Sequence, residues 1–415
     1  MLPNKKKILN DPVYGFVSIP YGIVFDLIEH PYFQRLRRIK QTSLTHYVYP
    51  GALHTRFHHA IGALHLTTEA LDVLCNKGVD ITPEEAEALQ IAVLLHDIGH
   101  GPFSHTLEHT LINFHHEDLS VLFMQRLNEI FNGKLTMAMQ IFLDEHPKPF
   151  LHQLVSGQLD MDRMDYLNRD SFFTGVHEGV IGYDRIIKML AVKDGELVVE
   201  EKGIYSVEKF LIARRLMYWQ VYLHKTVLAA EQMLVQTLKR AKELMQNGMT
   251  LEAPKNLLFF LQNDLSYNNF KTNRDELLDR FATLDDHDIV TALKNWTNSD
   301  DKLLTYFANG LLNRRLFKSE LRNKPFDVEY VDDIRCKAEK WGAFPKELIP
   351  YLVFQGKETN SAYTTLKDEI NILHKDGTVL PMSANADFGI QSKIVTKYYL
   401  CYPKEILVED GKMGG

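Results

Sequence analysis

The segment His96-Asp97-Ile98-Gly99-His100-Gly101-Pro102-Phe103-Ser104-His105 determines how the rest of the chain is interpreted. It follows residues 82–95, where a threonine cap, a proline at the first helical position and a glutamate three residues after the cap predict the start of a helix. The apolar stripe of this helix contains Ala86, Leu89 and Val93 and leads directly to His96-Asp97. We therefore expect both polar side chains to be buried.

Burying an imidazole and a carboxylate costs several kcal/mol unless they are paired or bind a metal. For an isolated His-Asp pair, a hydrogen bond within the core would be an equally good explanation. Two further residues of ligand type occur in this chain. His59 lies on a predicted helix over residues 56–74, and Asp162 lies in the acidic segment 160–166. Two imidazoles and two carboxylates suit an octahedral divalent ion with open positions for water and substrate. Without thiolates, a closed tetrahedral zinc site is less favoured.

Composition excludes several classes of protein. Of the 415 residues, 45% are hydrophobic and 24% are charged, as in soluble globular proteins, and no apolar run of eighteen residues predicts a membrane span. Three widely separated cysteines, Cys75, Cys336 and Cys401, argue against a disulfide framework and favour the cytoplasm. A net charge of -7 argues against a protein that coats nucleic acid, although clustered arginines could still bind small anions.

The spacing of glycine and proline predicts a mainly α-helical protein with a small mixed α/β C-terminal unit. Residues 204–247 contain neither breaker, which predicts one long helix or two helices with a kink. Alternating residues at 363–366, 370–373 and 394–400, with a hairpin turn at 375–378, predict strands near the C-terminus. We divide the chain into an N-terminal segment (1–50) that begins with a strand-like stretch, a helical core (51–330) and the C-terminal unit (331–415).

A series of motifs follows in a fixed order between Lys7 and Lys225. They are Asn10-Asp11-Pro12-Val13-Tyr14-Gly15, Phe33-Gln34-Arg35-Leu36-Arg37-Arg38-Ile39-Lys40-Gln41, Tyr49-Pro50-Gly51-Ala52, His54-Thr55-Arg56-Phe57-His58-His59, the His96 to His105 segment, and residues 160–170. This ordered series resembles the HD-domain phosphohydrolases, and most closely their deoxynucleoside triphosphate triphosphohydrolase branch. The resemblance covers about half of the chain.

The resemblance implies a set of metal ligands and a set of catalytic residues. The ligands of one divalent ion (Mn, Mg, Fe, Ni or Zn) would be His59, His96, Asp97 and Asp162. The residues around the scissile phosphate would be His100, His105, Glu108 and His116. We expect the neighbouring His58 to be a solvated helix residue, and we prefer His116 over His115 for its spacing to Glu117.

The resemblance also implies a substrate and a reaction. The phosphate contacts would be Arg56, Arg163, Arg214 and Lys225, and the sugar contacts would be Gln41, Tyr166, Asp170 and Tyr222. Arginine can grip phosphate oxygens bidentately, and an aromatic ring under the ribose leaves little space for a 2′-hydroxyl. The implied reaction is hydrolysis of deoxynucleoside triphosphates to deoxynucleoside and tripolyphosphate.

A second set of residues matches positions that bind an activating nucleotide between subunits in some relatives, with Glu29 in place of an aspartate. These are Lys7, Asn10, Glu29, Gln34 and Arg37. An activating nucleotide and a homo-oligomer, dimer or tetramer, are therefore expected, whereas a membrane or nucleic-acid partner is not. Two other functions stay open: the same site acting on a nucleoside monophosphate, a cyclic nucleotide or an alarmone, or a nucleotide-binding protein with minor catalysis.

Overall fold

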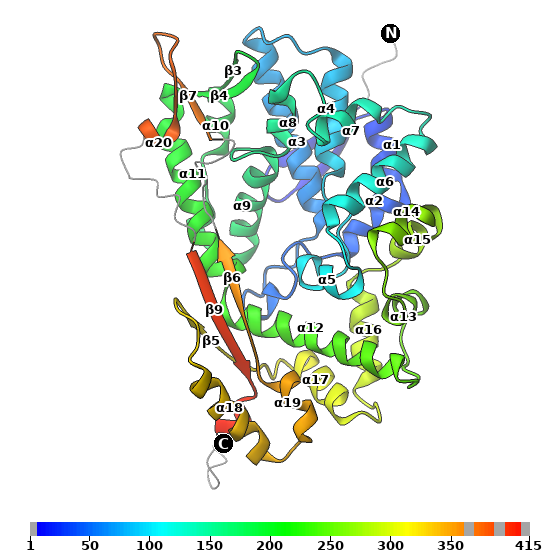
Figure 1. The fold of residues 1–415 in the computed structure, drawn as a ribbon. Coiled ribbons are helices and arrows are strands. Elements are labelled where there is room, and N and C mark those ends of the chain that lie inside the picture. The colour runs from blue at the N-terminus through cyan, green and yellow to red at the C-terminus, as the bar shows by residue number, and fades with distance from the viewer. Residues whose placement is uncertain (1–5, 361–368, 386–394, 408–415) are drawn as a thin grey trace.

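The computed structural model describes residues 6–360, 369–385 and 395–407, and it is mainly helical, as predicted (Figure 1). The helices of the first half are α1 (Ile23–Glu29), α2 (Pro31–Gln34), α3 (Arg56–Asn76), α4 (Pro83–Leu95), α5 (Glu108–Leu111), α6 (His116–Ile130), α7 (Thr136–Phe142), α8 (Pro149–Val155), α9 (Met161–Thr174) and α10 (Tyr183–Met189). Those of the second half are α11 (Ile204–Met217), α12 (Lys225–Gln246), α13 (Lys255–Gln262), α14 (Tyr267–Thr272), α15 (Arg274–Phe281), α16 (Asp286–Trp296), α17 (Lys302–Leu312), α18 (Val328–Trp341), α19 (Ile349–Leu352) and α20 (Met382–Asn385).

Helix α3 lies at the centre of the N-terminal half, where it packs against both α4 and α9 (Figure 1). The predicted helices at 56–74 and from residue 83 are thus confirmed, including the capping box of α4. Helix α3 has a capping box too, because Nδ1 of His58 accepts a hydrogen bond from the backbone N–H of Thr55 (3.1 Å). Our expectation for His58 needs correction: it is half-buried and closes the N-terminus of α3 instead of projecting into solvent.

The segment without breakers forms two helices, which was one of the two predicted outcomes. Helix α11 ends in a π-helical turn at Tyr218–Tyr222, and α12 begins at Lys225. His224 caps α12, since its side chain accepts a hydrogen bond from the backbone N–H of Thr226 (3.2 Å). The bend between the helices places Tyr222 on a short turn instead of a continuous helix.

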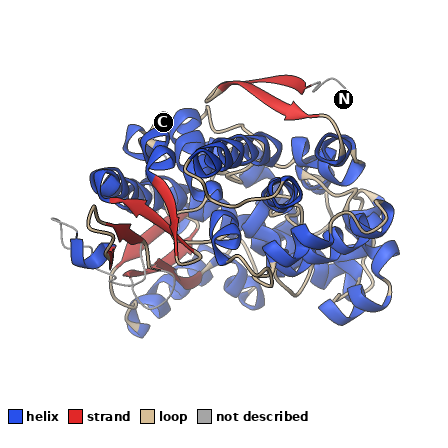
Figure 2. Ribbon diagram, turned by 90° about the horizontal axis from the view of Figure 1, so that it is seen from above, coloured by secondary structure: helices blue, strands red, loops and turns tan. Residues whose placement is uncertain are grey.

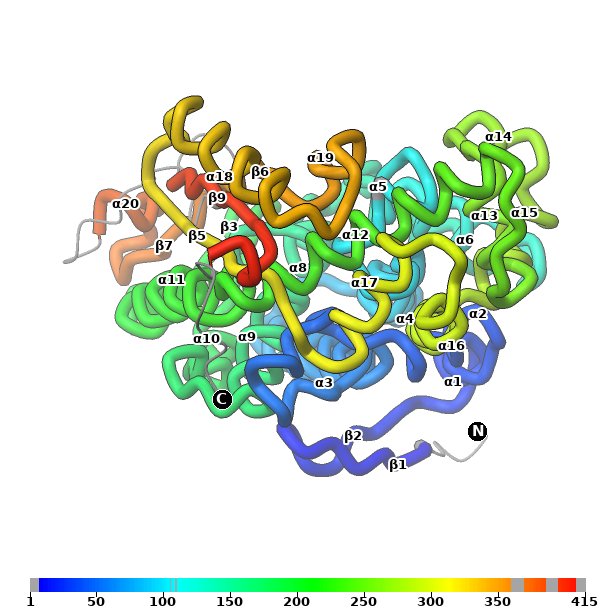
Figure 3. Tube along the Cα trace, turned by 90° about the horizontal axis from the view of Figure 1, so that it is seen from below, coloured from blue at the N-terminus to red at the C-terminus, as the bar shows by residue number. Residues whose placement is uncertain are grey.

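The strands form three small sheets. They are β1 (Lys6–Asp11), β2 (Gly15–Pro20), β3 (Leu190–Lys193), β4 (Glu196–Glu200), β5 (Lys318–Arg322), β6 (Phe354–Asn360), β7 (Asn371–Leu373), β8 (Val379–Pro381) and β9 (Val395–Tyr402). The sheet orders are β1-β2, β3-β4-β7-β8 and β5-β9-β6, with only the β4–β7 pair parallel among the described pairings. The β1–β2 hairpin lies at the edge of the molecule, away from the C-terminal strands (Figures 2 and 3).

The strands and the hairpin turn predicted near the C-terminus at 370–378 and 394–400 are found as β7, the β7–β8 turn and β9, whereas residues 363–366 lie outside the described residues. Two sheets join strands from both sides of residue 330, namely β4 with β7 and β5 with β9. The proposed division into three units is not tested by these pairings and stays a prediction. In the described part of the chain, no helix combines the length and the apolar character needed to cross a membrane.

Glu231 on α12 carries a carboxyl group that interacts with Ser43, with Thr106 and with Glu358 of the C-terminal sheet. Burial raises the pKa of Glu231 to about 7, although hydrogen bonds from the hydroxyls of Ser43 and Thr106 favour the ionised form. The negative charge of Glu358 on β6 raises the pKa of Glu231 further. Folding therefore favours the protonated form of this side chain, and the ionised form costs stability.

Replacing Glu231 with glutamine should stabilise the protein at alkaline pH but not at acidic pH. The unfolded side chain titrates near 4.5 and the folded one near 7, so the cost of ionisation develops as the pH rises through this window and reaches at most about 3 kcal/mol. Urea unfolding of both proteins at pH 4.5 and pH 8.5 measures the difference. Glu243→Gln on the same helix is the control, because its pKa is lowered by Tyr351 and Arg240, and it should show no such gain. A pH-independent difference for Glu231→Gln would contradict the account.

Candidate active site

Four predicted metal ligands converge at the meeting point of α3, α4 and α9. Nε2 of His59 lies 3.3 Å from Nε2 of His96 and 3.1 Å from Oδ1 of Asp162. Nε2 of His96 lies 3.5 Å from both Oδ1 of Asp162 and Oδ1 of Asp97. Octahedral ligands at about 2.1 Å from one ion are roughly 3 Å apart, so two nitrogens and two carboxylates at these separations fit a divalent ion.

In both His59 and His96, the ring nitrogen Nδ1, on the side away from the other ligands, is bound by a hydrogen-bond acceptor. Nδ1–H of His59 donates to Oδ2 of Asp165 (2.8 Å), and Nδ1–H of His96 donates to the carbonyl oxygen of Val93 (2.6 Å). Each hydrogen bond fixes the ring and the tautomer and directs the lone pair of Nε2 toward the other ligands. Asp165 is fully buried, and the sequence analysis quoted its segment but did not select it.

The charges of this site favour a cation among the ligands. Burial lowers the pKa of His59, but hydrogen bonds to Asp162 and Asp165 outweigh burial and raise the pKa to about 10. Burial raises the pKa of Asp162, but the hydrogen bonds and charges of His59 and His96 bring it well below its usual range. The carboxylates thus stay ionised and favour protonated histidines. A bound metal ion could supply this positive charge in place of the protons.

A buried ion pair supports His59 from behind. The guanidinium of Arg169 donates to both oxygens of Asp165 (2.9 Å each) and to Oδ2 of Asp11 (2.7 Å). This pair needs space next to α3, which Gly62 provides. A Cβ atom on Gly62 would lie 2.0 Å from Oδ1 of Asp165 and 2.1 Å from Nη2 of Arg169.

The segment after α4, residues 98–107, which we call the histidine turn, brings His100 to the same site. The ring of His100 stacks on that of His116 with centroids 3.8 Å apart, and Nε2 of His100 lies 3.3 Å from Oδ1 of Asp97. Burial and the positive charge of Arg56 hold the pKa of His100 well below its usual range, so this imidazole is neutral at pH 7. Asp97, His100 and His116 form a second group with metal-ligand spacing that shares Asp97 with the first.

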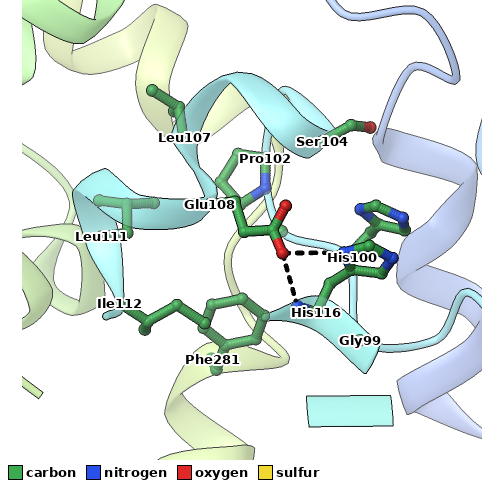
Figure 4. Close-up of a pocket in the computed structure, with 11 residues that line it drawn as sticks. Gly99, His100, Pro102, Ser104, Leu107, Glu108, Leu111, Ile112, His116 and Phe281 are labelled. Atoms are coloured by element: carbon green, nitrogen blue, oxygen red, sulfur yellow. Dashed lines mark hydrogen bonds and ion pairs between the residues drawn. The ribbon is translucent and has the colours of Figure 1, made fainter. Parts of the chain in front are cut away.

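Glu108 orients His116 from the opposite wall of a small pocket (Figure 4). Its Oε1 accepts hydrogen bonds from the backbone N–H (2.8 Å) and from Nδ1–H (2.9 Å) of His116. His115 also lies near this carboxylate, with its Nδ1 3.4 Å from Oε1 of Glu108, but its side chain is 69% exposed, compared with 18% for His116, and the preference for His116 stays a prediction. The side chain of His105, predicted as catalytic, lies outside the described part of the chain.

The predicted phosphate contacts lie on four helices, α3, α9, α11 and α12. Arg56 starts α3, where its Nη1 pairs with Asp97 and its Nε donates to Oγ of Ser104 (2.8 Å). Arg163 on α9 pairs with Asp160, and Nη1 of Arg214 on α11 donates to Oε1 of Gln158 (3.2 Å). Lys225 is exposed at the first position of α12.

The predicted sugar contacts include a pair of tyrosines near these arginines. The rings of Tyr166 and Tyr222 are 6.1 Å apart. Burial raises the pKa of Tyr166 to about 12, and the positive charges of Arg214 and Arg163 act against this rise. Asp170 accepts hydrogen bonds from the hydroxyl of Tyr222 (2.6 Å) and from Nε2–H of His54 (2.6 Å), a buried histidine that the sequence analysis did not select.

Gln41 and the residues predicted to bind an activator lie in the N-terminal part of the chain. Oε1 of Gln41 is buried and has no hydrogen-bond partner among the described residues, as expected of a group that awaits a ligand. Gln34 accepts a hydrogen bond from Nε of Arg37 (2.9 Å), and Lys7 lies 5.3 Å from the ring of Phe25 on α1. Asn10 and Glu29 are exposed on β1 and α1.

Replacing Gly62 with alanine should weaken metal binding, although alanine favours helix formation. The new methyl group would displace the Asp165–Arg169 pair and release His59, and losses of such supporting contacts typically cost 10- to 100-fold in metal affinity. Chelator competition with Mn²⁺ measures this affinity. Gly310→Ala is a matched control in α17, where the closest atom to the new Cβ would be the flexible end of Met233 at 3.0 Å. Equal affinity for both variants would contradict this account.

Comparison with protein families agrees with the geometry. Residues 56–170 match the HD domain model, and residues 181–256 match the HD associated region. The first match begins at Arg56, contains the four candidate ligands and ends at Asp170.

Three similar proteins align with most of the chain. A phosphohydrolase crystal structure from Bacteroides thetaiotaomicron is 51% identical, has a TM-score of 0.92 and covers 96% of this chain and 100% of its own. The protein YwfO of Bacillus subtilis is 28% identical over 99% of this chain and 95% of its own length. The deoxynucleoside triphosphate triphosphohydrolase SAMHD1 homolog of Dictyostelium discoideum is 31% identical over 61% of this chain and 52% of its own length, so the chain spans about half of this relative.

Three observations point to the same family: the ordered motifs, the converging candidate ligands and the 51% identical phosphohydrolase structure. The HD match adds a metal-binding domain to this picture, although the identity of the metal is not fixed by it. The chain therefore belongs to the HD-domain phosphohydrolases and is an enzyme of that family.

Proposed function

We propose that this enzyme hydrolyses deoxynucleoside triphosphates to deoxynucleoside and tripolyphosphate. One observation carries the proposal: Asp162, Arg163 and Tyr166 follow one another within five residues of α9, and the positive charges of Arg163 and Arg214 both act on the hydroxyl of Tyr166. A metal ligand, two guanidinium groups and an aromatic ring are thus grouped as a phosphorylated sugar would require. The similarity to a triphosphohydrolase supports this substrate class.

The ion would be held by His59, His96, Asp97 and Asp162, and when bound it supplies Lewis acidity and a nucleophile derived from water at neutral pH. Water would attack the α-phosphorus, and the bond from this phosphorus to O5′ of the sugar would break. O5′ then needs a proton, which His116 would supply; the hydrogen bond from its Nδ1–H to Glu108, which orients the ring, supports this role. Arg56 and Arg163 would neutralise the charge on the phosphate chain.

The ring of Tyr166 would pack against the sugar and exclude a 2′-hydroxyl, while Asp170 holds the hydroxyl of its neighbour Tyr222. We also propose that an activating nucleotide binds near Lys7, Asn10, Glu29, Gln34 and Arg37. The Gln34–Arg37 pair supports this, because it already combines a guanidinium with an amide at the surface. A homo-oligomer in the cytoplasm completes the proposal.

The direct test is product analysis with purified protein and Mn²⁺ or Mg²⁺. With all four deoxynucleoside triphosphates mixed and GTP present, we expect equal amounts of deoxynucleoside and tripolyphosphate, and the same assays with single substrates and without GTP show whether an activator is required. Turnover that requires the mixture or GTP would support the activator site. Release of pyrophosphate or orthophosphate, or turnover of monophosphates or cyclic nucleotides alone, would reject the proposed reaction in favour of another phosphohydrolase activity.

Tyr166→Ala should weaken the preference for deoxyribonucleotides over ribonucleotides and leave the amount of bound metal unchanged. Removing the ring opens space for a 2′-hydroxyl, so we expect the ratio of kcat/KM values for dGTP and GTP to fall roughly ten-fold, which is about 1.4 kcal/mol. Tyr205→Ala, at the exposed N-terminal end of α11, is the matched control and should keep the wild-type ratio. Loss of bound metal in Tyr166→Ala would show that Tyr166 supports the ligands instead of the sugar.

A further inference from the structure

The histidine turn has an unusual backbone. Phe103 and Ser104 have φ angles of 53° and 52°, so two consecutive residues other than glycine adopt the left-handed conformation. Residues with a Cβ atom rarely adopt this conformation, and it persists only when surrounding contacts hold it. The turn carries His100 and the backbone of His105, so whatever holds it also sets the position of catalytic groups.

Asp286, the first residue of α16, provides this contact from a distant part of the chain. Its Oδ1 accepts a hydrogen bond from the backbone N–H of Phe103 (2.8 Å). Its Oδ2 accepts hydrogen bonds from the backbone N–H of Lys40 (3.0 Å) and from Nζ of Lys40 (3.3 Å). The side chain is 2% exposed, so one buried carboxylate joins the histidine turn to the segment that precedes Gln41.

A second set of hydrogen bonds closes the connection. Oγ of Ser104 donates to the carbonyl oxygen of Lys40 (3.2 Å) and accepts from Nε of Arg56 (2.8 Å). Both backbone groups of Lys40 are therefore used, its N–H by Asp286 and its carbonyl by Ser104. These two contacts join Lys40 to the histidine turn, while backbone hydrogen bonds from Gln41 N–H to the carbonyl of His54 (3.0 Å) and from Arg56 N–H to the carbonyl of Ile39 (2.9 Å) join the same segment to the start of α3.

Neighbours of Asp286 act on the same two segments. Asp285 caps α16 and pairs with Arg38, and the ring of Phe281 on α15 lies against Gly101, where a Cβ atom would be 2.9 Å from Cζ. Figure 4 shows Phe281 on the wall of the pocket that Glu108 and His116 share. Residues 274–296 lie outside the two matched family segments, 56–170 and 181–256.

We propose that Asp286 is a positioning residue for catalysis, which holds the histidine turn and Gln41 in the arrangement that the reaction needs. It acts through Phe103 and Lys40 and does not touch the metal ligands. Loss of its negative charge would leave the N–H of Phe103 or of Lys40 without a full acceptor, and the strained turn would relax. Both the catalytic histidines and the proposed sugar contact would then be displaced.

Asp286→Asn tests the proposal with little change in shape. One amide oxygen can still serve Phe103, but the amide nitrogen would face the N–H and Nζ of Lys40. We expect faster backbone hydrogen exchange in peptides that cover residues 38–41 and 101–107. With a deoxynucleoside triphosphate as substrate, we expect kcat to fall at least ten-fold and KM to rise, while the bound metal stays at the wild-type amount. The kinetic part rests on the proposed function, whereas the exchange part does not.

Asp301→Asn is the matched control, because Asp301 accepts a hydrogen bond from the backbone N–H of Leu304 (2.7 Å) and pairs with Arg240, far from residues 38–41 in the sequence. It should lose similar stability with unchanged kcat and KM. A second variant, Lys40→Met, removes only the side-chain contact to Asp286 and should give a smaller change of the same kind. Unchanged exchange at residues 38–41 and 101–107 in Asp286→Asn would overturn the proposal. The proposal would also be overturned if KM stayed unchanged and kcat fell only in proportion to the amount of bound metal or of folded protein that is lost. If the wild type hydrolyses no deoxynucleoside triphosphate but the exchange difference appears, the proposed substrate fails and the positioning contact stands.

Discussion

The structure depends on keeping ionised groups buried at the point where α3, α4 and α9 meet. Nε2 of His59 lies within 3.7 Å of Nε2 of His96, of Oδ2 of Asp97 and of Oδ1 of Asp162. Such a cluster is tolerated only if each charge has a partner, so further groups surround it. Asp165 faces His59, Arg169 faces Asp165, and Gly62 leaves the space that this pair occupies. The same buried groups therefore determine both how the three helices pack and which chemistry the site can perform.

The sequence predicted the parts of the site that local patterns encode. The apolar stripe before His96-Asp97 and the capping box of α4 correctly predicted where that helix begins and that His96 is buried. Partners that come from distant residues were missed. Asp165 lies within a quoted segment, and its i, i+4 relation to Arg169 was an available signal. For Asp286 the sequence offers no such signal. It follows Phe103 by 183 residues, and only the tertiary fold brings the two residues together.

Irregular backbone was similarly hard to predict. The absence of breakers in residues 204–247 could not distinguish one helix from two, since the π-helical turn at Tyr218–Tyr222 contains neither glycine nor proline. The left-handed Phe103 and Ser104 follow from hydrogen bonds to Asp286 and Lys40, not from their own preferences. Parallel pairing of β4 with β7 joins residues 173 positions apart, such as Val198 and Asn371, so no hairpin signal in the sequence could predict it. These features lie where tertiary contacts override local propensity.

Location of the ion tests the central claim most directly, because Asp97 belongs to two groups with metal-ligand spacing. Crystals of the Mn²⁺-loaded protein would give an anomalous scattering peak at the ion. The account predicts a peak about 2.2 Å from Nε2 of His59, Nε2 of His96 and carboxylate oxygens of Asp97 and Asp162. A peak centred instead among Asp97, His100 and His116, with none beside His59, would contradict it.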